Sequence, residues 1–297
     1  MCSSTTTPFE WASLRRRIGA ELLALFRRPL YWGTALAVSG FSVLLQGLLY
    51  LSIQHANNLP AEALNAAKQS MAWPQSLSTG LEMIAPQALG GLAVLVLSTL
   101  FVAQEYSWGS LALVVSRGTA RRTWLLSKIL TLAIGIVGLL GIQLVVAGAF
   151  GILVTAGNNA IQTEQHTFGV TAFAQNVGAV LYGLLPYAAL GILLAVATRS
   201  AAVALGIGLG YTLLVEPLLA ALSGNLLPKW MGQYLLRALG EALQYTSGEI
   251  HAQLAFGSAG ASKTPAFISS ETAILLIAIY VILFLVAGTA LLSRQDL

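Results

Sequence analysis

The chain is 297 residues long, with 57% hydrophobic and 9% charged residues, a formal net charge of +4 and a mean hydropathy of +0.78. Because soluble domains carry about 25% charged residues, this composition excludes a soluble enzyme or binding domain and predicts a membrane protein. The single cysteine, Cys2, also excludes an intramolecular disulfide framework and a multi-cysteine metal site. No polar stretch is long enough for a separate catalytic domain, so we expect residues 1–297 to form one transmembrane domain.

The first predicted element is a helix over residues 9–28. Phe9, Trp11, Leu14 and Ile18 begin a series of apolar residues at helical spacing, and arginines stand between them. Such a basic amphipathic helix is typical of segments that lie along a membrane surface, with their cations near anionic headgroups. The alternative is a soluble extension of the first membrane span, and Pro29 favours a break between the two.

Six stretches are apolar and long enough to cross a bilayer as a helix, which requires roughly 20 residues. They are residues 31–53, 84–103, 125–155, 173–197, 201–222 and 272–292. The third is longer than one crossing needs, so it either tilts or projects from the membrane. Only Thr198, Arg199 and Ser200 separate the fourth from the fifth, which predicts a tight hairpin. The predicted fold is therefore all-α and polytopic, with six transmembrane helices.

The gap between the second and third spans, residues 104–124, has a pattern of its own. Glu105 ends the second span, and Leu111, Val114 and Val115 follow at the spacing of one helix face. We expect a short amphipathic helix here, bounded by two glycines and followed by cations. These residues are Gly109 and Gly118, and then Arg117, Arg121, Arg122 and Lys128. Considered alone, the pattern also fits a basic loop with no further role.

The cations orient the predicted bundle. If the N-terminus is cytoplasmic, 11 of the 15 Lys and Arg residues fall inside, and only Lys68, Lys229, Arg237 and Lys263 fall outside. The positive-inside rule therefore predicts a multi-pass protein of the cell membrane (inner or plasma membrane), with both termini cytoplasmic. This asymmetry also accounts for the pI of about 9.3, so no nucleic-acid partner is expected.

The last outer loop, residues 223–271, contains the segment NLLPKWMGQYLLRALGEALQYTSGEI. Its apolar and polar residues alternate with roughly helical period, which predicts one or two short amphipathic helices on the outer leaflet. The three histidines, His55, His166 and His251, fall in outer loops without metal-ligand spacing. We therefore expect no metal site, no catalytic site and no cofactor in this chain.

One acidic residue lies within a predicted span. Glu216 is about 15 residues into the fifth span and directly precedes Pro217. Ionisable residues inside a membrane are costly and often mark function, so these two residues are candidates for a translocation path or a proton-sensitive gate. The alternative is a carboxylate that reaches the outer interface because Pro217 bends the helix.

Residues 105–128, ExxxGSLALVVSRGTARRxxLLSK, resemble the first cytoplasmic loop of type-2 ATP-binding-cassette (ABC) exporter permeases. The family pattern is approximately ExxxGTLRLLLSRPVSRxRLLLGK. The positions that match it are Glu105, Gly109, Leu111, Leu113, Ser116, Arg117, Arg121, Leu125, Leu126 and Lys128. The chain departs from it at Ser110, Ala112, Gly118 and Ser127. Six spans and a basic amphipathic N-terminal helix are also similar to that family.

The resemblance implies a permease subunit that is not itself an enzyme. In such exporters this loop docks on a separate ATPase subunit, which binds ATP and Mg²⁺, and two ATPase copies drive two permeases. The expected partners are therefore two ATPase subunits, a second permease copy or paralogue, and the lipid bilayer. The coupling residues would be Glu105, Gly109, Leu111, Val114, Val115, Arg117, Arg121 and Lys128. The alternative is a secondary transporter or channel driven by an ion gradient, for which Glu216 and Pro217 are the only candidate residues within a span.

Overall fold

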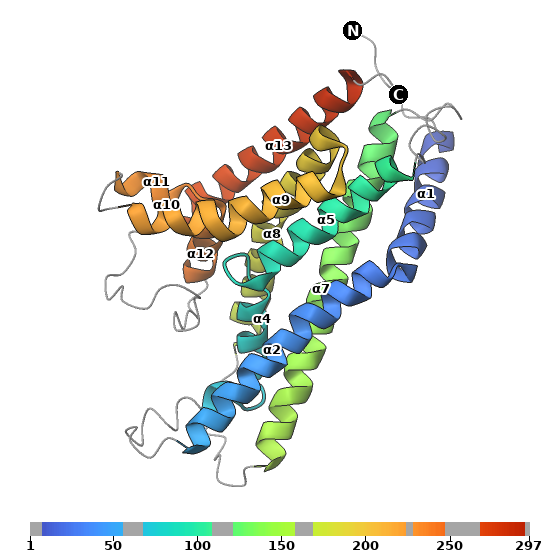
Figure 1. Cartoon of the computed structure of the whole chain (residues 1–297). Helices are drawn as coiled ribbons and strands as arrows, with labels where there is room; N and C mark the ends of the chain where they lie inside the picture. The colour runs from blue at the N-terminus through green and yellow to red at the C-terminus, as the bar shows by residue number, and fades with distance from the viewer. Residues whose placement is uncertain are drawn as a thin grey trace.

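The computed structural model describes residues 8–55, 68–108, 121–157, 169–223, 228–246 and 268–294. Within these ranges the chain forms helices and no strand. Six helical segments are long and apolar enough to cross a membrane, which confirms the predicted number (Figure 1). They are α2 (Pro29–His55), α5 (Leu89–Ser107), α7 (Arg121–Gly157), α8 (Val170–Thr198), a composite of α9 (Ala201–Gly210), the π-helix η1 (Tyr211–Val215) and α10 (Glu216–Leu222), and α13 (Ser270–Arg294).

The N-terminal helix α1 (Pro8–Arg27) is separated from α2 by a bend at Arg28. Pro29 begins α2, a position where the missing backbone N–H costs no hydrogen bond. Helix α1 packs against the first part of α7, and the fully buried Leu25 lies over Gly135. The structure thus contains the break favoured by Pro29, while the placement of α1 along a membrane surface stays a prediction.

The second span begins later than hydropathy predicts. A separate helix, α4 (Ser76–Met83), precedes it, and α5 begins at Leu89 rather than at residue 84. Pro86 lies between the two helices, where it removes no hydrogen bond from a helix interior. Helix α4 packs against α7 at Gly80, where an added Cβ would lie only 2.2 Å from the Cβ of Ala147. Residues 76–83, which lie before the predicted second span, are therefore packed into the bundle.

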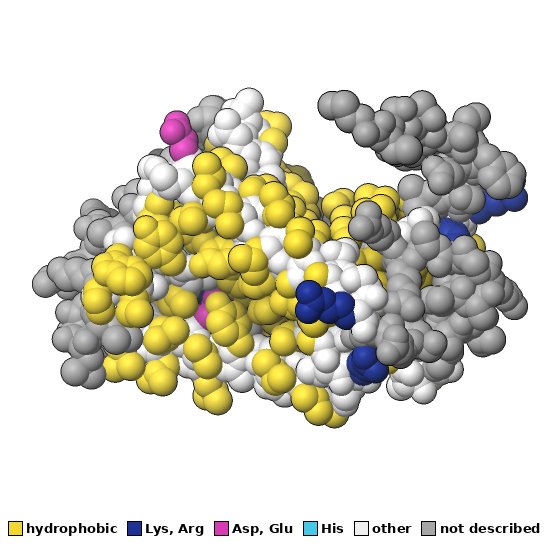
Figure 2. Space-filling view, turned by 90° about the horizontal axis from the view of Figure 1, so that it is seen from above, with side chains coloured by type: hydrophobic (Ala, Val, Ile, Leu, Met, Phe, Trp, Pro, Cys, Tyr) yellow, Lys and Arg dark blue, Asp and Glu magenta, His cyan; other side chains and the backbone are white. Residues whose placement is uncertain are grey.

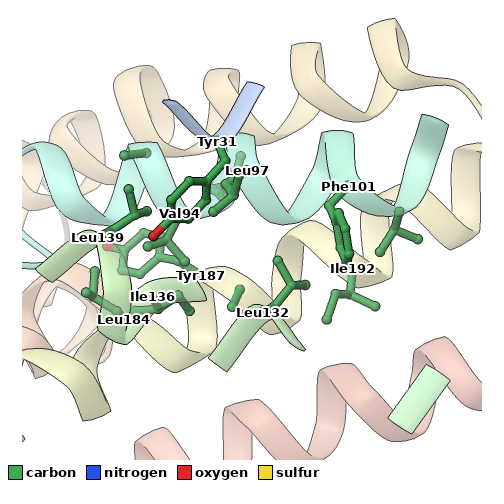
Figure 3. Packing of buried hydrophobic residues seen from close by; sticks show 14 of the residues in the cluster. Tyr31, Val94, Leu97, Phe101, Leu132, Ile136, Leu139, Leu184, Tyr187 and Ile192 are labelled. Carbon is green, nitrogen blue, oxygen red and sulfur yellow. The ribbon is translucent and has the colours of Figure 1, made fainter. Parts of the chain in front are cut away.

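The core forms where α5 meets α7, α8 and the start of α2 (Figure 3). Helix α5 is the most enclosed of the six spans, with two thirds of its apolar window buried. Its apolar side chains contact those of the neighbouring helices around the buried rings of Tyr31, Phe101 and Tyr187. Gly191 permits the close approach of α8 to α5, because its missing side chain leaves room for Ser98.

Large apolar side chains also cover much of the outer surface. Leu36, Val145 and Leu153 are each more than 70% exposed, and Figure 2 shows hydrophobic side chains spread over one face with few charges among them. In water such a surface would drive aggregation, whereas lipid tails solvate it at no cost. The exposed leucines therefore support a chain that spans a membrane.

The exposed aromatic residues occur at both ends of the bundle. We call the end where α1 and α7 start and α5 and α13 finish the α1 end (Figure 1); Trp108, directly after α5, lies there and is more than half exposed. The opposite end carries α11 (Lys229–Gln233) and α12 (Leu236–Thr246), and its exposed rings are Trp73, Trp230 and Tyr234. Aromatic rings at both ends are typical of the two interfaces of a membrane.

Helices α11 and α12 fall in the segment predicted to form short amphipathic helices. The apolar face of α12 packs on the protein, because Leu239 and Leu243 are buried with Ala273 and Ile277 of α13. A position on the outer leaflet for these helices stays a prediction. The predicted hairpin between the fourth and fifth spans has Arg199 in the left-handed conformation, with φ of 53°.

Substituting Gly191 tests the packing of α5 against α8. A Cβ at this position would lie 2.0 Å from Ser98 Oγ and 2.9 Å from the Leu95 carbonyl oxygen, so we expect Gly191→Ala to cost about 1–3 kcal/mol through overpacking. The measurement is thermal unfolding of the purified protein in detergent. Gly178→Ala, on the same helix but with no atom within 4 Å of the added Cβ, should leave the melting temperature unchanged or raise it. Equal effects of the two substitutions would contradict this account.

Candidate functional site

The two charged motif residues at the borders of the 104–124 gap meet in the structure. Glu105 lies in the last turn of α5 and Lys128 lies two turns into α7, and their side chains form an ion pair. Lys128 is fully buried and Glu105 is 8% exposed. Trp124 donates a hydrogen bond from Nε1 to the other carboxylate oxygen of Glu105 at 2.9 Å. The helices that enter and leave the gap are thus joined directly.

A second carboxylate binds the same ammonium group from the N-terminal helix. Glu21 of α1 accepts a hydrogen bond from Lys128 Nζ at 2.5 Å, and its side chain is 21% exposed. Three helices, α1, α5 and α7, therefore meet at one buried cation. We call Glu21, Glu105, Trp124 and Lys128 the ionic cluster.

The local sequence explains this convergence. Residues four apart lie on one face of a helix, so Phe101 shares a face of α5 with Glu105, and Trp124 shares a face of α7 with Lys128. Both pairs face the same interface, and Phe101 is fully buried there beside Lys128, whose Nζ lies 4.2 Å from the ring centroid. A cation near an aromatic ring gains a further attraction, which partly offsets its desolvation.

A second cation, Arg28, also lies near the ring of Phe101. The guanidinium carbon of Arg28 is 5.2 Å from the Phe101 centroid and 5.1 Å from that of Trp108. Its Nη1 donates a hydrogen bond to the side-chain oxygen of Gln104 at 3.3 Å. The two carboxylates of the ionic cluster are therefore balanced by two cations, one in direct contact and one across a buried ring.

The burial of these charges calls for an explanation, because a buried ion pair commonly stabilises a fold no more than apolar residues of the same size. In some proteins a buried ion pair instead specifies one arrangement of the elements that it joins. Ionisable residues within membrane spans are also rare and commonly mark function, and Glu105 and Lys128 both lie in candidate spans. The cluster is thus suited to fix α1, α5 and α7 in a defined relative position.

The structure does not describe the side chains of the other predicted coupling residues. Gly109, Leu111, Val114, Val115 and Arg117 lie outside the described residues, and so does the predicted short helix. Arg121 is the first residue of α7, but its side chain is not among those described. For this site the structure therefore places Glu105 and Lys128 together and leaves the other predicted residues untested.

Sequence reasoning missed Glu21, Arg28 and Trp124. Glu21 is 107 positions before Lys128, so no local spacing connects them. Its one signal is a carboxylate within the otherwise basic segment RRRIGAELLALFRR. An acid in such a helix could have been expected to bind a cation from elsewhere in the fold.

The second predicted site surrounds Glu216, which is 2% exposed. Its carboxylate accepts hydrogen bonds from the Tyr187 hydroxyl at 3.1 Å and from the backbone N–H of Arg237 at 3.3 Å, and it also interacts with the Tyr211 hydroxyl. Arg237 is in the first turn of α12, and a helix N-terminus stabilises an anion through its free N–H groups and its dipole. Glu216 therefore points into the protein and joins the fifth span to α8 and α12.

Pro217 explains the irregular helix before it. Proline cannot donate a hydrogen bond to the preceding turn, and the five residues of η1 widen the helix directly before Glu216. Single π-helical turns of this kind occur frequently at functional sites. Among the described residues no group of three or more His, Cys, Asp or Glu side chains could hold a metal ion.

Residues 42–297 match the family described as "Protein of unknown function (DUF2705)". No curated protein matches the chain. The matched region includes Glu105, Lys128 and Glu216, whereas Glu21 and Arg28 precede it.

Removing the cation of the ionic cluster tests its contribution. Lys128→Met leaves Glu21 and Glu105 without their shared ammonium group, and we expect a loss of about 3–5 kcal/mol, because an unpaired buried charge is strongly destabilising. Thermal unfolding in detergent measures it, and Arg294→Met, at an exposed position of the same end, is the control. The triple variant Lys128→Met, Glu21→Gln, Glu105→Gln should recover most of the stability. A triple variant as unstable as the single one would show that the charges do not interact.

Proposed function

We propose that this chain, which belongs to the DUF2705 family, is the membrane-spanning permease subunit of a type-2 ABC exporter. Residues 104–124 then dock on a separate ATPase subunit, of which two copies bind ATP and Mg²⁺. A second permease copy or paralogue completes the transporter. The observation that carries the proposal is the buried ion pair between Glu105 and Lys128, since both residues belong to the motif that resembles the coupling loop of that class.

The ion pair supports a coupling role because of where it lies. It joins the two helices on either side of the gap just where the gap begins and ends. A push on the gap would therefore move α5 and α7 as one body instead of bending the connection between them. Rigid-body movement of packed helices is an established route by which local contacts change a transport path.

Two further contacts would pass a movement of α5 and α7 to other helices. Glu21 connects α1 to the same ammonium group, so the N-terminal helix would follow the movement. At its other face α5 packs closely against α8, where Gly191 lies beside Ser98 and Leu95. A tilt of α5 would thus be passed directly to the fourth span.

We infer that the α1 end faces the cytoplasm, where ATP is available. The described cations of this end are Arg15, Arg16, Arg17, Arg27, Arg28, Lys128, Arg199 and Arg294. A concentration of Arg and Lys at one end supports a cytoplasmic position through the positive-inside rule, with both termini inside and the chain in the cell membrane.

The second candidate is a transporter or channel driven by an ion gradient, and Glu216 is the observation that favours it. Its carboxylate is buried in a span, beside a π-helical turn and two tyrosines. Buried intramembrane carboxylates frequently serve proton or ion pathways. The donors that surround Glu216 also fit a purely structural joint between the fifth span, α8 and α12.

Copurification separates the two candidates. If the chain is an ABC permease, a soluble ATPase from the native host should follow the tagged full-length protein through two purification steps, and the eluate should hydrolyse ATP. Mass spectrometry identifies the partner, and a second membrane protein tagged in the same way is the control. A pure chain that moves ions along a gradient in vesicles, with transport lost in Glu216→Gln, would replace the ABC proposal by the second candidate.

Charge reversal tests the coupling gap itself. Arg117→Glu with Arg121→Glu should lower the ATPase activity of the copurified complex, because both residues lie beside the proposed docking segment. Arg199→Glu with Arg294→Glu changes the same charge at the same end, away from the gap, and should leave this activity intact. Membrane insertion, followed by the yield of folded protein in detergent, should be equal for both. Equal ATPase activity in the two double variants would contradict docking at this gap.

A further inference from the structure

An apolar groove runs along the outside of the bundle between α2 and α5. It has a volume of about 280 Å³ and is lined by Thr34, Ala37 and Phe41 from α2 and by Leu89, Leu92 and Val96 from α5. The Thr34 hydroxyl donates to the carbonyl oxygen of Tyr31 at 2.8 Å, so it offers no free donor to the groove. The groove is thus suited to hydrocarbon rather than to a polar ligand.

The helical register extends this groove toward the α1 end. Leu92 and Val96 belong to a half-exposed stripe of α5 at four-residue spacing, which continues through Leu100 and Gln104 and ends near Trp108. At 1.5 Å per residue, the distance from Leu89 to Leu100 is about 16 Å, close to half of the roughly 30 Å hydrocarbon thickness of a bilayer. The apolar part of the stripe therefore matches the depth of one leaflet.

Arg28 lies where this stripe becomes polar. Its guanidinium contacts Gln104 and the ring of Trp108, both of which belong to the same stripe. Arg28 is half-buried, and the ion pairs found among the described residues involve Lys128 and Arg237 but not Arg28. Trp108 is exposed, as expected of an aromatic residue at a headgroup interface.

We propose that this groove binds an anionic phospholipid, with an acyl chain along α2 and α5 and the phosphate at Arg28. The lining fits the chain, and Arg28, which forms no ion pair with the described carboxylates, fits the phosphate, because a guanidinium offers it parallel N–H donors. Arg27, the preceding residue, is exposed and adds a second positive charge to this segment. The site needs neither an ATPase nor a transported substrate, so it is independent of the proposed function.

Lipid retention by the full-length protein tests the site. The protein is purified in mixed micelles that contain equal amounts of phosphatidylglycerol and phosphatidylcholine with the same acyl chains, and native mass spectrometry counts the bound lipids. We expect the wild type to retain the anionic lipid about tenfold better, as a charge-assisted hydrogen bond predicts. Arg28→Gln should bring this preference close to unity, whereas Arg28→Lys should keep part of it. Arg294→Gln, at an exposed position of the same end, should keep all of it.

A second pair of variants examines the groove rather than the charge. Ala37→Phe fills the apolar lining and should reduce the retention of both lipids, while Ala287→Phe, on a separate apolar face of α13, should not. A wild-type preference in Arg28→Gln, or equal binding of glycerol phosphate without acyl chains, would overturn the proposal. So would an efficient disulfide-linked dimer of Ala37→Cys in a Cys2→Ser background, because a second copy of the chain would then cover the groove.

Discussion

One buried ammonium group holds the α1 end of this protein together. Lys128 is shared by Glu21 and Glu105, so three helices that are distant in sequence meet at a single atom. This contact adds to the apolar packing of α1 on α7 at Leu25 and Gly135, and together with the Trp124 hydrogen bond it joins the helices on either side of the 104–124 gap. The long helix α7, of 37 residues, exceeds the length of one membrane crossing, and its ionic contacts lie near its starting end. They hold the start of α7 beside Phe101, a residue of the bundle core.

At the opposite end of the bundle, Glu216 joins the fifth span to α8 and α12. There Glu216 accepts hydrogen bonds from the Tyr187 hydroxyl and from the backbone N–H of Arg237 at the N-terminus of α12. A helix N-terminus contributes partial positive charge to this contact. The chain has only 11 acidic residues, and three of them are used to join helices at the two ends. Carboxylates thus add directional contacts to the apolar packing that holds α1 and α12.

Hydropathy was sufficient to predict the six spans, because each is a long apolar run between charged or turn-forming residues. It misplaced the start of the second span, since the apolar residues around Pro86 look like a continuous helix until the proline is packed between α4 and α5. The motif predicted that Glu105 and Lys128 belong to one functional segment, but not that they touch. Glu21 and Tyr187 could not be predicted, because their partners are brought near only by the packing of separate helices. One sequence carries no signal for such long-range pairs.

The two proposed sites meet at the ring of Phe101. Its centroid lies 4.2 Å from the Lys128 ammonium and 5.2 Å from the Arg28 guanidinium. The same buried side chain therefore contacts the ionic cluster and the arginine proposed to bind the lipid phosphate. Arg28 is also bound to Gln104, the residue directly before Glu105. A phosphate that pulls on Arg28 therefore acts on the same turn of α5 that carries the ion pair. On this geometry, the lipid composition of the membrane and the docking of an ATPase would bias the position of one helix, which makes α5 the element through which both would act.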